Sequence, residues 1–300
     1  GHRLCGGTVH PRMNIARCSA RAGSTSVRVF SSSGVSQPRD MASDRNSKKL
    51  LVLGGTGFVG SEVCRQALAS GFSVVSVSRR GGSGKKDQVD WRAGDIAEQG
   101  VVQKILDEGG FLGVVHTVGL LFDADSGMGQ MNRLVSGVAS VPSQTDSYDR
   151  VTRQSALNAI DAASGREPRM PFVFVSAAEA GWPDVAFGPF IERWLAPSWL
   201  HRYLEAKRAV EHEMLKEERT VRGVIFRPSL IWTWSRLSTL PMILILTLCS
   251  MVGLPFVDRP VRKEALGAAI IGAIQNEQVV GVKRYTDIQS LCQEATGRPQ

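Results

Sequence analysis

A glycine-rich turn at residues 54–60 limits what this chain can fold into more than any other feature. The turn reads Gly-Gly-Thr-Gly-Phe-Val-Gly and directly follows the apolar run Lys49–Leu53. An apolar run of that length predicts a buried strand. A helical pattern then covers residues 61–70, and a second strand is expected over Phe72–Ser78. A strand, a glycine-rich turn, a helix and a strand within about 30 residues are the context that dinucleotide binding requires.

Each glycine of this turn has its own physical role in holding a phosphate group. Gly54 permits the tight turn, Gly57 lets the main chain approach a pyrophosphate, and Gly60 lets the helix pack closely on the strand. The helix N-terminus then offers amide N–H groups to the anion. A Rossmann domain that has lost its ligand would keep the same pattern. The candidate pyrophosphate-binding residues are Gly54, Thr56, Gly57, Phe58, Val59 and Gly60.

The end of the second expected strand indicates which coenzyme the turn would hold. An acidic residue there would accept the adenosine ribose hydroxyls and favour NAD(H). The chain instead has Arg79 and Arg80 directly after Ser78, and guanidinium groups bind phosphate in a bidentate manner. We therefore expect NADP(H), with NAD(H) as the less favoured coenzyme. The alternative is that both arginines are solvated loop charges.

The GxxGxxG spacing of the turn resembles that of the short-chain dehydrogenase/reductase superfamily, in its extended or atypical branch. The resemblance can be followed over residues 49–275. It implies an α/β fold, namely a doubly wound parallel Rossmann sheet with a small C-terminal substrate-side subdomain. We expect residues 49–230 to form the NAD(P)-binding domain and residues 231–300 to form the C-terminal substrate- or membrane-facing portion.

Two further coenzyme contacts are implied at strand ends. In the resembled family, the aspartate of a Gly-Asp-apolar step bonds the adenine amino group, which here corresponds to Asp95, with Ile96 against the ring. The alternative role for Asp95 is the N-cap of a helix that starts near Ile96. The fourth expected strand, 113–117, should end facing the coenzyme, which makes Thr117 a candidate contact. His116 is expected to be a packed or coenzyme-lining residue rather than a catalytic base.

A helical segment from Trp199 to Val210 carries the main catalytic candidates. Tyr203 and Lys207 are four residues apart, so they share one helix face. They match the YxxxK pair of the resembled superfamily. A phenol has an ordinary pKa near 10, and a neighbouring ammonium lowers that pKa by favouring the phenolate. Tyr203 would be the general acid/base for a carbonyl or alcohol, and Lys207 would also hold the nicotinamide ribose.

Two other positions of the resembled proton relay are altered. The fifth expected strand, 171–176, ends at Ser176, and Ala177 and Ala178 follow it. Related enzymes place a substrate-orienting hydroxyl where Ala177 falls, so Ser176, one step earlier, is the candidate substitute. Thr152 stands where many members carry a supporting asparagine. These changes leave open whether redox turnover is retained.

Residues 1–48 are expected to be a mitochondrial transit peptide and disordered linker. Residues 1–39 contain no Asp or Glu and are rich in Arg, Ser and Ala, a composition typical of such leaders. The segment 28–31 resembles a matrix-peptidase site with cleavage after Phe30, and Met13 is a candidate start. The alternative is a basic tail with no targeting role.

An uncharged apolar segment covers residues 237–257. Pro241 and Pro255 bracket only 13 of its residues, which is short for a membrane helix. We expect a core helix of the substrate-side subdomain or a membrane-surface or lipid-pocket element, with a true span as the third option. Five of the six Trp lie between Trp182 and Trp234, which suits an apolar pocket or a membrane interface as well as core packing.

Charge and cysteine content exclude several other functions. The formal net charge is +8, but residues 1–49 hold nine Lys/Arg against two Asp/Glu, and the other 251 residues carry 27 basic and 26 acidic groups. The body of the chain therefore lacks the basic excess of a nucleic-acid-binding domain. The five cysteines include no CxxC pair, so neither a disulfide scaffold nor a metal site is expected.

Within the superfamily, the chain most resembles mitochondrial Rossmann proteins of coenzyme Q (ubiquinone) biosynthesis. The resemblance rests on residues 51–60, 148–151 and 203–209. A more distant resemblance is to the Rossmann-type accessory subunit of respiratory complex I. These resemblances imply a location on the matrix side of the mitochondrial inner membrane. They also imply a quinone or prenylated small-molecule substrate, and a membrane surface or membrane-protein complex as partner.

Two classes of function follow from these features. One is an NADP(H)-dependent oxidoreductase in which Tyr203 moves the proton and Lys207 supports it. The other is a non-catalytic assembly or accessory subunit in which the coenzyme is structural and stabilises the fold by mass action. An epimerase or dehydratase of nucleotide sugars would share the fold, but the leader and the apolar segment count against it.

Overall fold

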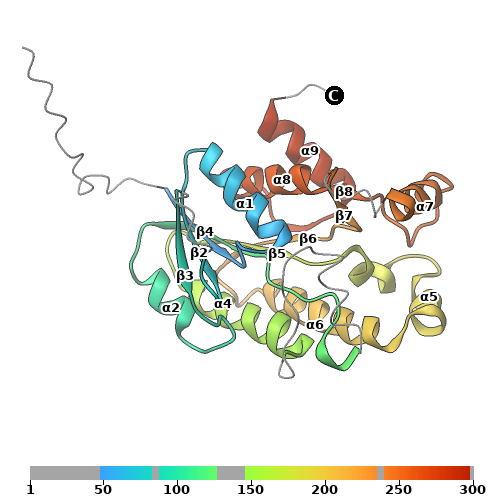
Figure 1. Ribbon diagram of the computed structural model, residues 1–300, viewed down its shortest axis with the longest axis horizontal. Helices are drawn as coiled ribbons and strands as arrows, with labels where there is room; N and C mark the ends of the chain where they lie inside the picture. Colours follow the sequence, from blue (N-terminus) through green and yellow to red (C-terminus); the bar gives the residue numbers. More distant parts are fainter. Residues whose placement is uncertain (1–47, 83–87, 127–145, 235–239, 298–300) are drawn as a thin grey trace, which may run out of the picture. The chain divides into compact units, whose positions relative to one another are not determined.

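A seven-stranded parallel sheet forms the centre of the molecule, with the order β3-β2-β1-β4-β5-β6-β9 (Figure 1). The computed structural model describes residues 48–82, 88–126, 146–234 and 240–297. Strand order runs outward from β1 on both sides, which is the doubly wound Rossmann arrangement and confirms the predicted fold class. The strands are β1 (Lys49–Leu53), β2 (Ser73–Ser78), β3 (Val89–Ala93), β4 (Phe111–His116), β5 (Pro171–Val175), β6 (Arg222–Phe226) and β9 (Gly281–Lys283).

Helices cover both faces of this sheet. Side chains of α1 (Phe58–Ala69), α8 (Lys263–Gln275) and α9 (Tyr285–Thr296) share one buried apolar cluster with the sheet. Those of α2 (Val101–Leu106), α4 (Ser155–Ala163) and α6 (Ser198–Met214) share the other (Figure 1). Two further helices, α5 (Gly188–Leu195) and α7 (Leu240–Met251), lie at the right of Figure 1. The remaining elements are η1 (Ala124–Ser126), η2 (Asp149–Gln154), η3 (Ala178–Asp184) and the parallel pair β7 (Ile231–Trp232) and β8 (Val261–Arg262).

The central strand β1 shows why its sequence is apolar throughout. Leu50 and Val52 belong to the cluster under α1 and α8, whereas Leu51 and Leu53 belong to the cluster under α4 and α6. All four side chains are fully buried. Strands of parallel sheets are covered on both faces, so an unbroken apolar run rather than an alternating one is the expected signature.

Two helices begin differently from the sequence prediction. Helix α1 starts at Phe58 instead of residue 61, because Gly57 in extended conformation is already its N-cap. The helix expected to start near Ile96 begins only at Val101, as α2. Helix α4 is preceded directly by the π-helix η2. The expected helix over 199–210 lies within α6.

Several sequence predictions fall on residues that the structure does not describe. They include the transit peptide, its cleavage after Phe30, the candidate start at Met13, and residues 237–239 of the apolar segment. The rest of that segment forms α7 and the turn that follows it. Within the described ranges, no helix combines the length and apolar character needed to cross a bilayer.

Arg222, at the start of β6, ties the sheet to the end of α8. Its guanidinium donates hydrogen bonds to the main-chain carbonyls of Ala273, Ile274, Asn276 and Val279, at 2.7 to 3.1 Å. The last carbonyls of a helix have no partner within the helix. A single side chain therefore satisfies acceptors at the helix end that would otherwise depend on water.

We expect Arg222→Met to lower the free energy of unfolding by about 2 kcal/mol, because it removes several hydrogen bonds from a charged donor. Urea denaturation of the purified protein measures this change. Arg153→Met is the matched control, since Arg153 is exposed and pairs with Asp149 one helical turn away. The control should cost less than about 0.5 kcal/mol. Equal losses in the two variants would contradict the assigned role of Arg222.

Candidate functional site

A cavity of about 660 Å³ opens at the carboxyl ends of β1, β2 and β4. Its volume lies within the roughly 300–1,000 Å³ typical of small-molecule pockets. The cavity lies where strand order reverses at β1, the position at which open α/β sheets bind ligands. Its walls include residues 54–57, 77–82, 94–97 and 117–120, together with Ser61, Trp91, Asp146, Arg150, Val151 and Ser155.

The glycine-rich turn packs so tightly that side chains would not fit. Gly54 has a φ of +88°, and a Cβ there would lie 2.7 Å from Cγ2 of Val118. A Cβ on Gly60 would lie 2.2 Å from the carbonyl oxygen of Gly54, and one on Gly57 would lie 3.0 Å from the same oxygen. No side chain caps the first turn of α1. The turn is therefore a main-chain cradle beside a helix N-terminus, which fits the phosphates of a dinucleotide.

The six candidate residues of this turn divide into two groups. Gly54, Thr56 and Gly57 line the cavity, whereas Phe58, Val59 and Gly60 are not part of its wall. Val59 and Gly60 are buried, and the Phe58 ring contacts the ammonium of Lys263 at 5.3 Å. Any contact of these three with a phosphate would use main-chain N–H groups, which stays a prediction.

The adenosine end of the cavity brings together the predicted residues Arg79, Arg80, Asp95 and Ile96. Asp95 does not cap a helix, because α2 begins only at Val101 with Gly100 as its N-cap. Instead its Oδ1 accepts a hydrogen bond from the Ala97 amide at 3.0 Å, which closes a turn. The expectation of a helix starting near Ile96 is therefore wrong, and the Asp95 side chain stays at the cavity wall.

Two residues of this wall were missed by sequence analysis. Asp146 Oδ2 lies 2.6 Å from Nη1 of Arg79, and Arg150 Nη2 lies 2.8 Å from Oδ2 of Asp95. Burial opposes ionisation of Asp95, but hydrogen bonds from Arg150 and from an amide hold its pKa below the ordinary value. Two arginines of the wall, Arg79 and Arg150, are thus paired with carboxylates, although the Arg79 side chain is still 44% exposed.

The predicted catalytic pair lies beside the inner end of the cavity, outside its wall. Lys207 is 3% exposed, and its Nζ donates a hydrogen bond to the carbonyl of Val175 at 2.8 Å. A Cβ on Gly119, which does line the cavity, would lie 3.4 Å from this Nζ. Tyr203 is one turn earlier on α6, with its ring centroid 5.7 Å from the Lys207 Nζ. The helix therefore brings both residues to this end of the site, as the spacing predicted.

The electrostatics of this pair differ from the expectation. Burial raises the pKa of Tyr203 above its ordinary value, and the carboxylate of Glu179 raises it further. Burial also lowers the pKa of Lys207 to about 8. The predicted lowering of the Tyr203 pKa by Lys207 is therefore wrong for the protein without bound ligand. Burial is the largest effect on the pKa of both groups, and for Lys207 it outweighs the opposing charge of Glu211.

Two buried hydroxyls beside this pair lack a hydrogen-bond partner among the described residues. They are Ser176 Oγ, the predicted catalytic serine, and Thr152 Oγ1. The Thr152 hydroxyl lies 3.9 Å from where a Cβ on Gly119 would be. Buried polar atoms are nearly always paired, so a bound polar group would satisfy them. Neither residue is part of the cavity wall, so a contact between these hydroxyls and a coenzyme stays a prediction.

His116 and Thr117 end β4 with different surroundings. His116 is fully buried, and its Nε2 lies 3.0 Å from Ser155 Oγ. Burial, followed by the charge of Lys207, lowers the pKa of His116 to about 3. His116 is thus a neutral packed residue, as expected. Thr117 lines the cavity while its hydroxyl donates to the carbonyl of Leu53 at 2.8 Å.

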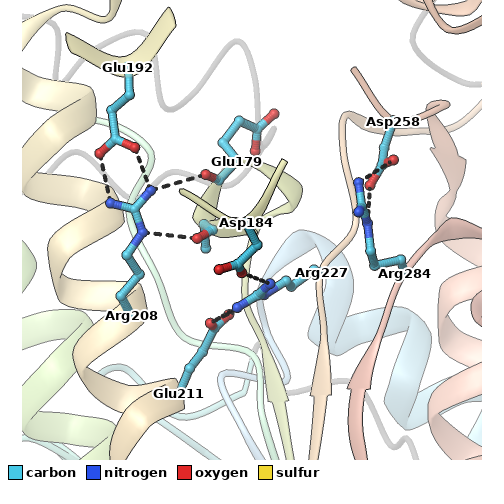
Figure 2. A network of polar contacts seen from close by, with 9 residues as sticks. Glu179, Asp184, Glu192, Arg208, Glu211, Arg227, Asp258 and Arg284 are labelled. Atoms are coloured by element: carbon cyan, nitrogen blue, oxygen red, sulfur yellow. Dashed lines mark hydrogen bonds and ion pairs between the residues drawn. The ribbon is translucent and has the colours of Figure 1, made fainter. Parts of the chain in front are cut away.

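A network of paired charges joins α6 to α5 and to Arg227, which directly follows β6 (Figure 2). Arg208 binds Glu192, and Arg227 binds Glu211, each in a bidentate manner. Arg208 also binds the main-chain carbonyl of Glu179, not its carboxylate. Burial raises the pKa of the Glu179 carboxyl, and the charge of Asp258 adds to the effect. Glu179, which sequence analysis missed, is therefore a titratable group whose charge acts on Tyr203.

The lowered pKa of Lys207 makes stability depend on pH in a defined window. In the unfolded chain Lys207 titrates near 10.5, so between pH 8 and 10.5 the unfolded state binds more protons. Stability should therefore rise with pH in this window. We expect the unfolding free energy to increase by about 1.5 kcal/mol from pH 8 to pH 9.5, relative to the variant Lys207→Met. Urea denaturation at both pH values measures it, and parallel changes in the two proteins would contradict it.

Sequence comparisons relate the chain to known proteins. A sequence profile described as "NAD dependent epimerase/dehydratase family" matches residues 50–232. The chain is 30% identical over 208 residues to an uncharacterized chloroplastic protein of Arabidopsis thaliana. That match covers 68% of this chain and 57% of the plant protein, so the chain spans less than two thirds of this relative. It is also 28% identical over 218 residues to MIOREX complex component 2 of Saccharomyces cerevisiae, covering 61% of this chain and 73% of the yeast protein.

Solved structures of similar fold include enzymes bound to either coenzyme. The UDP-glucose 4-epimerase of Thermus thermophilus, in complex with NAD, has a TM-score of 0.52, with 18% identity and 84% of each chain covered. A small-chain dehydrogenase in complex with NADPH has a TM-score of 0.51, with 16% identity, and the match covers 82% of this chain and 99% of that chain. At such low identity these similarities establish the fold alone.

Proposed function

Because this chain belongs to the NAD dependent epimerase/dehydratase family, we propose that it is a mitochondrial NAD(P)(H)-binding, dehydrogenase-like protein that acts in ubiquinone biosynthesis or supports it. The observation that carries the coenzyme part is the main-chain cradle of Gly54, Gly57 and Gly60 at the mouth of the cavity. The leader composition supports the mitochondrial part. The ubiquinone part rests on the resemblance of residues 51–60, 148–151 and 203–209.

The residues present assign a role to each part of the coenzyme. The turn at Gly54–Gly57 would hold the pyrophosphate, Asp95 and Ile96 the adenine, and Lys207 the nicotinamide ribose. When bound, NAD(P)(H) supplies or accepts a hydride. Tyr203 would exchange the proton with a carbonyl or alcohol oxygen, and Ser176 would orient that oxygen.

A lipophilic substrate and a membrane surface are supported by exposed apolar side chains. On α7 these are Leu244, Ile245, Leu248 and Met251, each more than half exposed. On and beside α5 they are Phe187, Phe190, Trp194 and Leu195, exposed by 59 to 71%. The turn that follows α7 is joined to η3, the element before α5, since the indole N–H of Trp182 donates to the carbonyl of Phe256 at 2.9 Å. Apolar helix faces with exposed Trp are typical of elements that lie in the membrane interface.

We expect the double substitution Leu244→Glu with Leu248→Glu to reduce binding to phosphatidylcholine/phosphatidylglycerol vesicles at least tenfold, because it places charge in the apolar face. Flotation of the purified protein with vesicles measures the change. Leu215→Glu is the matched control, since Leu215 at the end of α6 is 53% exposed and Leu248 is 52% exposed. Unchanged binding of the double variant, or an equal loss in the control, would contradict the proposed membrane contact.

A non-catalytic subunit with a structural coenzyme is the second candidate function. The yeast relative is named as a complex component. Ala177 replaces the usual substrate-orienting hydroxyl, Thr152 replaces the supporting asparagine, and burial raises the Tyr203 pKa. Nucleotide-sugar epimerization is a weaker candidate, because the similarity to epimerase structures at 15 to 18% identity extends only to the fold.

Mass spectrometry of nucleotide released from the purified protein tests the proposal directly. Titration with NADPH and NADH followed by coenzyme fluorescence then gives the affinities, and addition of a short-chain quinone tests turnover. Oxidation of bound NADPH by the quinone supports the enzyme. Bound coenzyme that neither quinones nor carbonyl compounds oxidise supports the structural subunit. Absence of binding by either coenzyme would overturn the proposed function.

Two substitutions separate coenzyme binding from proton transfer. Gly57→Asp places a carboxylate in the phosphate cradle, so we expect coenzyme affinity to fall more than a hundredfold. Tyr203→Phe should leave the affinity within threefold of the wild type and abolish turnover if the protein is an enzyme. Fluorescence titration and cellular ubiquinone content measure the two effects. Normal ubiquinone content with Tyr203→Phe, together with loss for Gly57→Asp, would exclude proton transfer by Tyr203.

A further inference from the structure

Two arginine–aspartate pairs stand side by side on the adenosine wall of the cavity. Arg79 pairs with Asp146 at 2.6 Å, and Arg150 pairs with Asp95 at 2.8 Å. The two pairs interact electrostatically. The positive charge of Arg79 helps to lower the pKa of Asp95, and the negative charge of Asp146 helps to raise the pKa of Arg150. All four residues line the cavity, and so does Arg80. The wall is therefore a cluster of alternating charges rather than a purely basic patch.

Asp146 is the most buried member of this cluster. Its side chain is 5% exposed, whereas that of Arg79 is 44% exposed. Arg79 directly follows β2, the strand whose end meets the adenosine ribose in dinucleotide-binding folds. The ion pair thus lies where the two coenzymes would differ, since NAD(H) carries a 2′-hydroxyl on this ribose and NADP(H) carries a 2′-phosphate.

The two coenzymes would affect this ion pair differently. A 2′-phosphate would compete with Asp146 for the Arg79 guanidinium and would place negative charge close to the Asp146 carboxylate. A 2′-hydroxyl carries no charge, leaves the ion pair intact, and can donate a hydrogen bond to a carboxylate. Like charges a few ångströms apart at a partly buried site repel strongly. The carboxylate therefore opposes the preference for phosphate that the arginines alone would give.

We infer that Asp146 is a specificity-determining residue of this pocket, which holds Arg79 in an ion pair and thereby weakens the preference for NADP(H) over NAD(H). The inference rests on the proposed coenzyme binding and adds the residue that sets its selectivity. It also revises the role of Arg79, which becomes fully available to a 2′-phosphate only when the charge of Asp146 is removed.

Asp146→Asn tests the inference, because the amide keeps the size of the side chain and removes its charge. We expect the ratio of the NADH to the NADPH dissociation constant to rise about tenfold, mainly through tighter NADPH binding. Asp146→Glu, which keeps the charge, should retain the wild-type ratio. Asp146→Ser repeats the test if the asparagine variant does not fold. Fluorescence titration of the full chain with each coenzyme gives the constants, and the melting temperature without coenzyme checks folding.

Asp149→Asn is the control variant, since Asp149 is 69% exposed and pairs with Arg153 outside the cavity wall. It should leave the ratio within twofold of the wild type. A ratio for Asp146→Asn within twofold of the wild type, with both coenzymes bound, would overturn the inference alone. Failure of the wild type to bind either coenzyme would instead overturn the proposed function and the inference with it.

Discussion

The close contact between the Gly54 carbonyl and the first turn of α1 is the constraint on which the site depends. The Gly57 amide donates to this carbonyl at 2.8 Å, and the Gly54 amide donates to Val77 of β2 at the same distance. The turn therefore joins β1, β2 and α1 by main-chain bonds, and Gly60 leaves room for the contact because it has no Cβ. Because these bonds fix the N-terminus of α1 at the carboxyl ends of β1 and β2, they also fix where an anion can bind.

The parts of the fold that the sequence predicts are those determined locally. Glycines at fixed spacing and apolar runs of about five residues identify β1, the turn and β2, since their conformations depend on near neighbours. The adenosine wall depends on pairs far apart in the chain. Arg79 and Asp146 are separated by 67 residues, and Asp95 and Arg150 by 55. No local pattern marks such partners, which is why Asp146 and Arg150 were missed although both arginines after β2 were identified.

The catalytic pair illustrates a different limit of sequence reasoning. The YxxxK spacing correctly places Tyr203 and Lys207 on one face of α6, because helix periodicity is local. It does not give their pKa values, since those depend on burial by elements such as β5 and η3 that lie far away in the sequence. For Tyr203, burial is the largest effect on the pKa, and the carboxylate of Glu179 acts in the same direction. Sequence spacing therefore predicts which side chains lie close together, whereas burial in the folded protein determines their pKa values.

The same reasoning explains why counting arginines overstates the attraction of this pocket for phosphate. The body of the chain carries almost equal numbers of basic and acidic groups, and Arg79 and Arg150 of the cavity wall are paired with carboxylates. Arg208 and Arg227, outside that wall, are paired in the same way (Figure 2). A coenzyme phosphate that approaches such a wall exchanges one ion pair for another instead of neutralising a free cation. The net gain is then the difference between two desolvated interactions, each partly cancelled by the cost of removing charge from water. We therefore expect coenzyme affinity in this site to depend mainly on the uncharged cradle of glycines, and selectivity to depend on the acids that compete for the arginines.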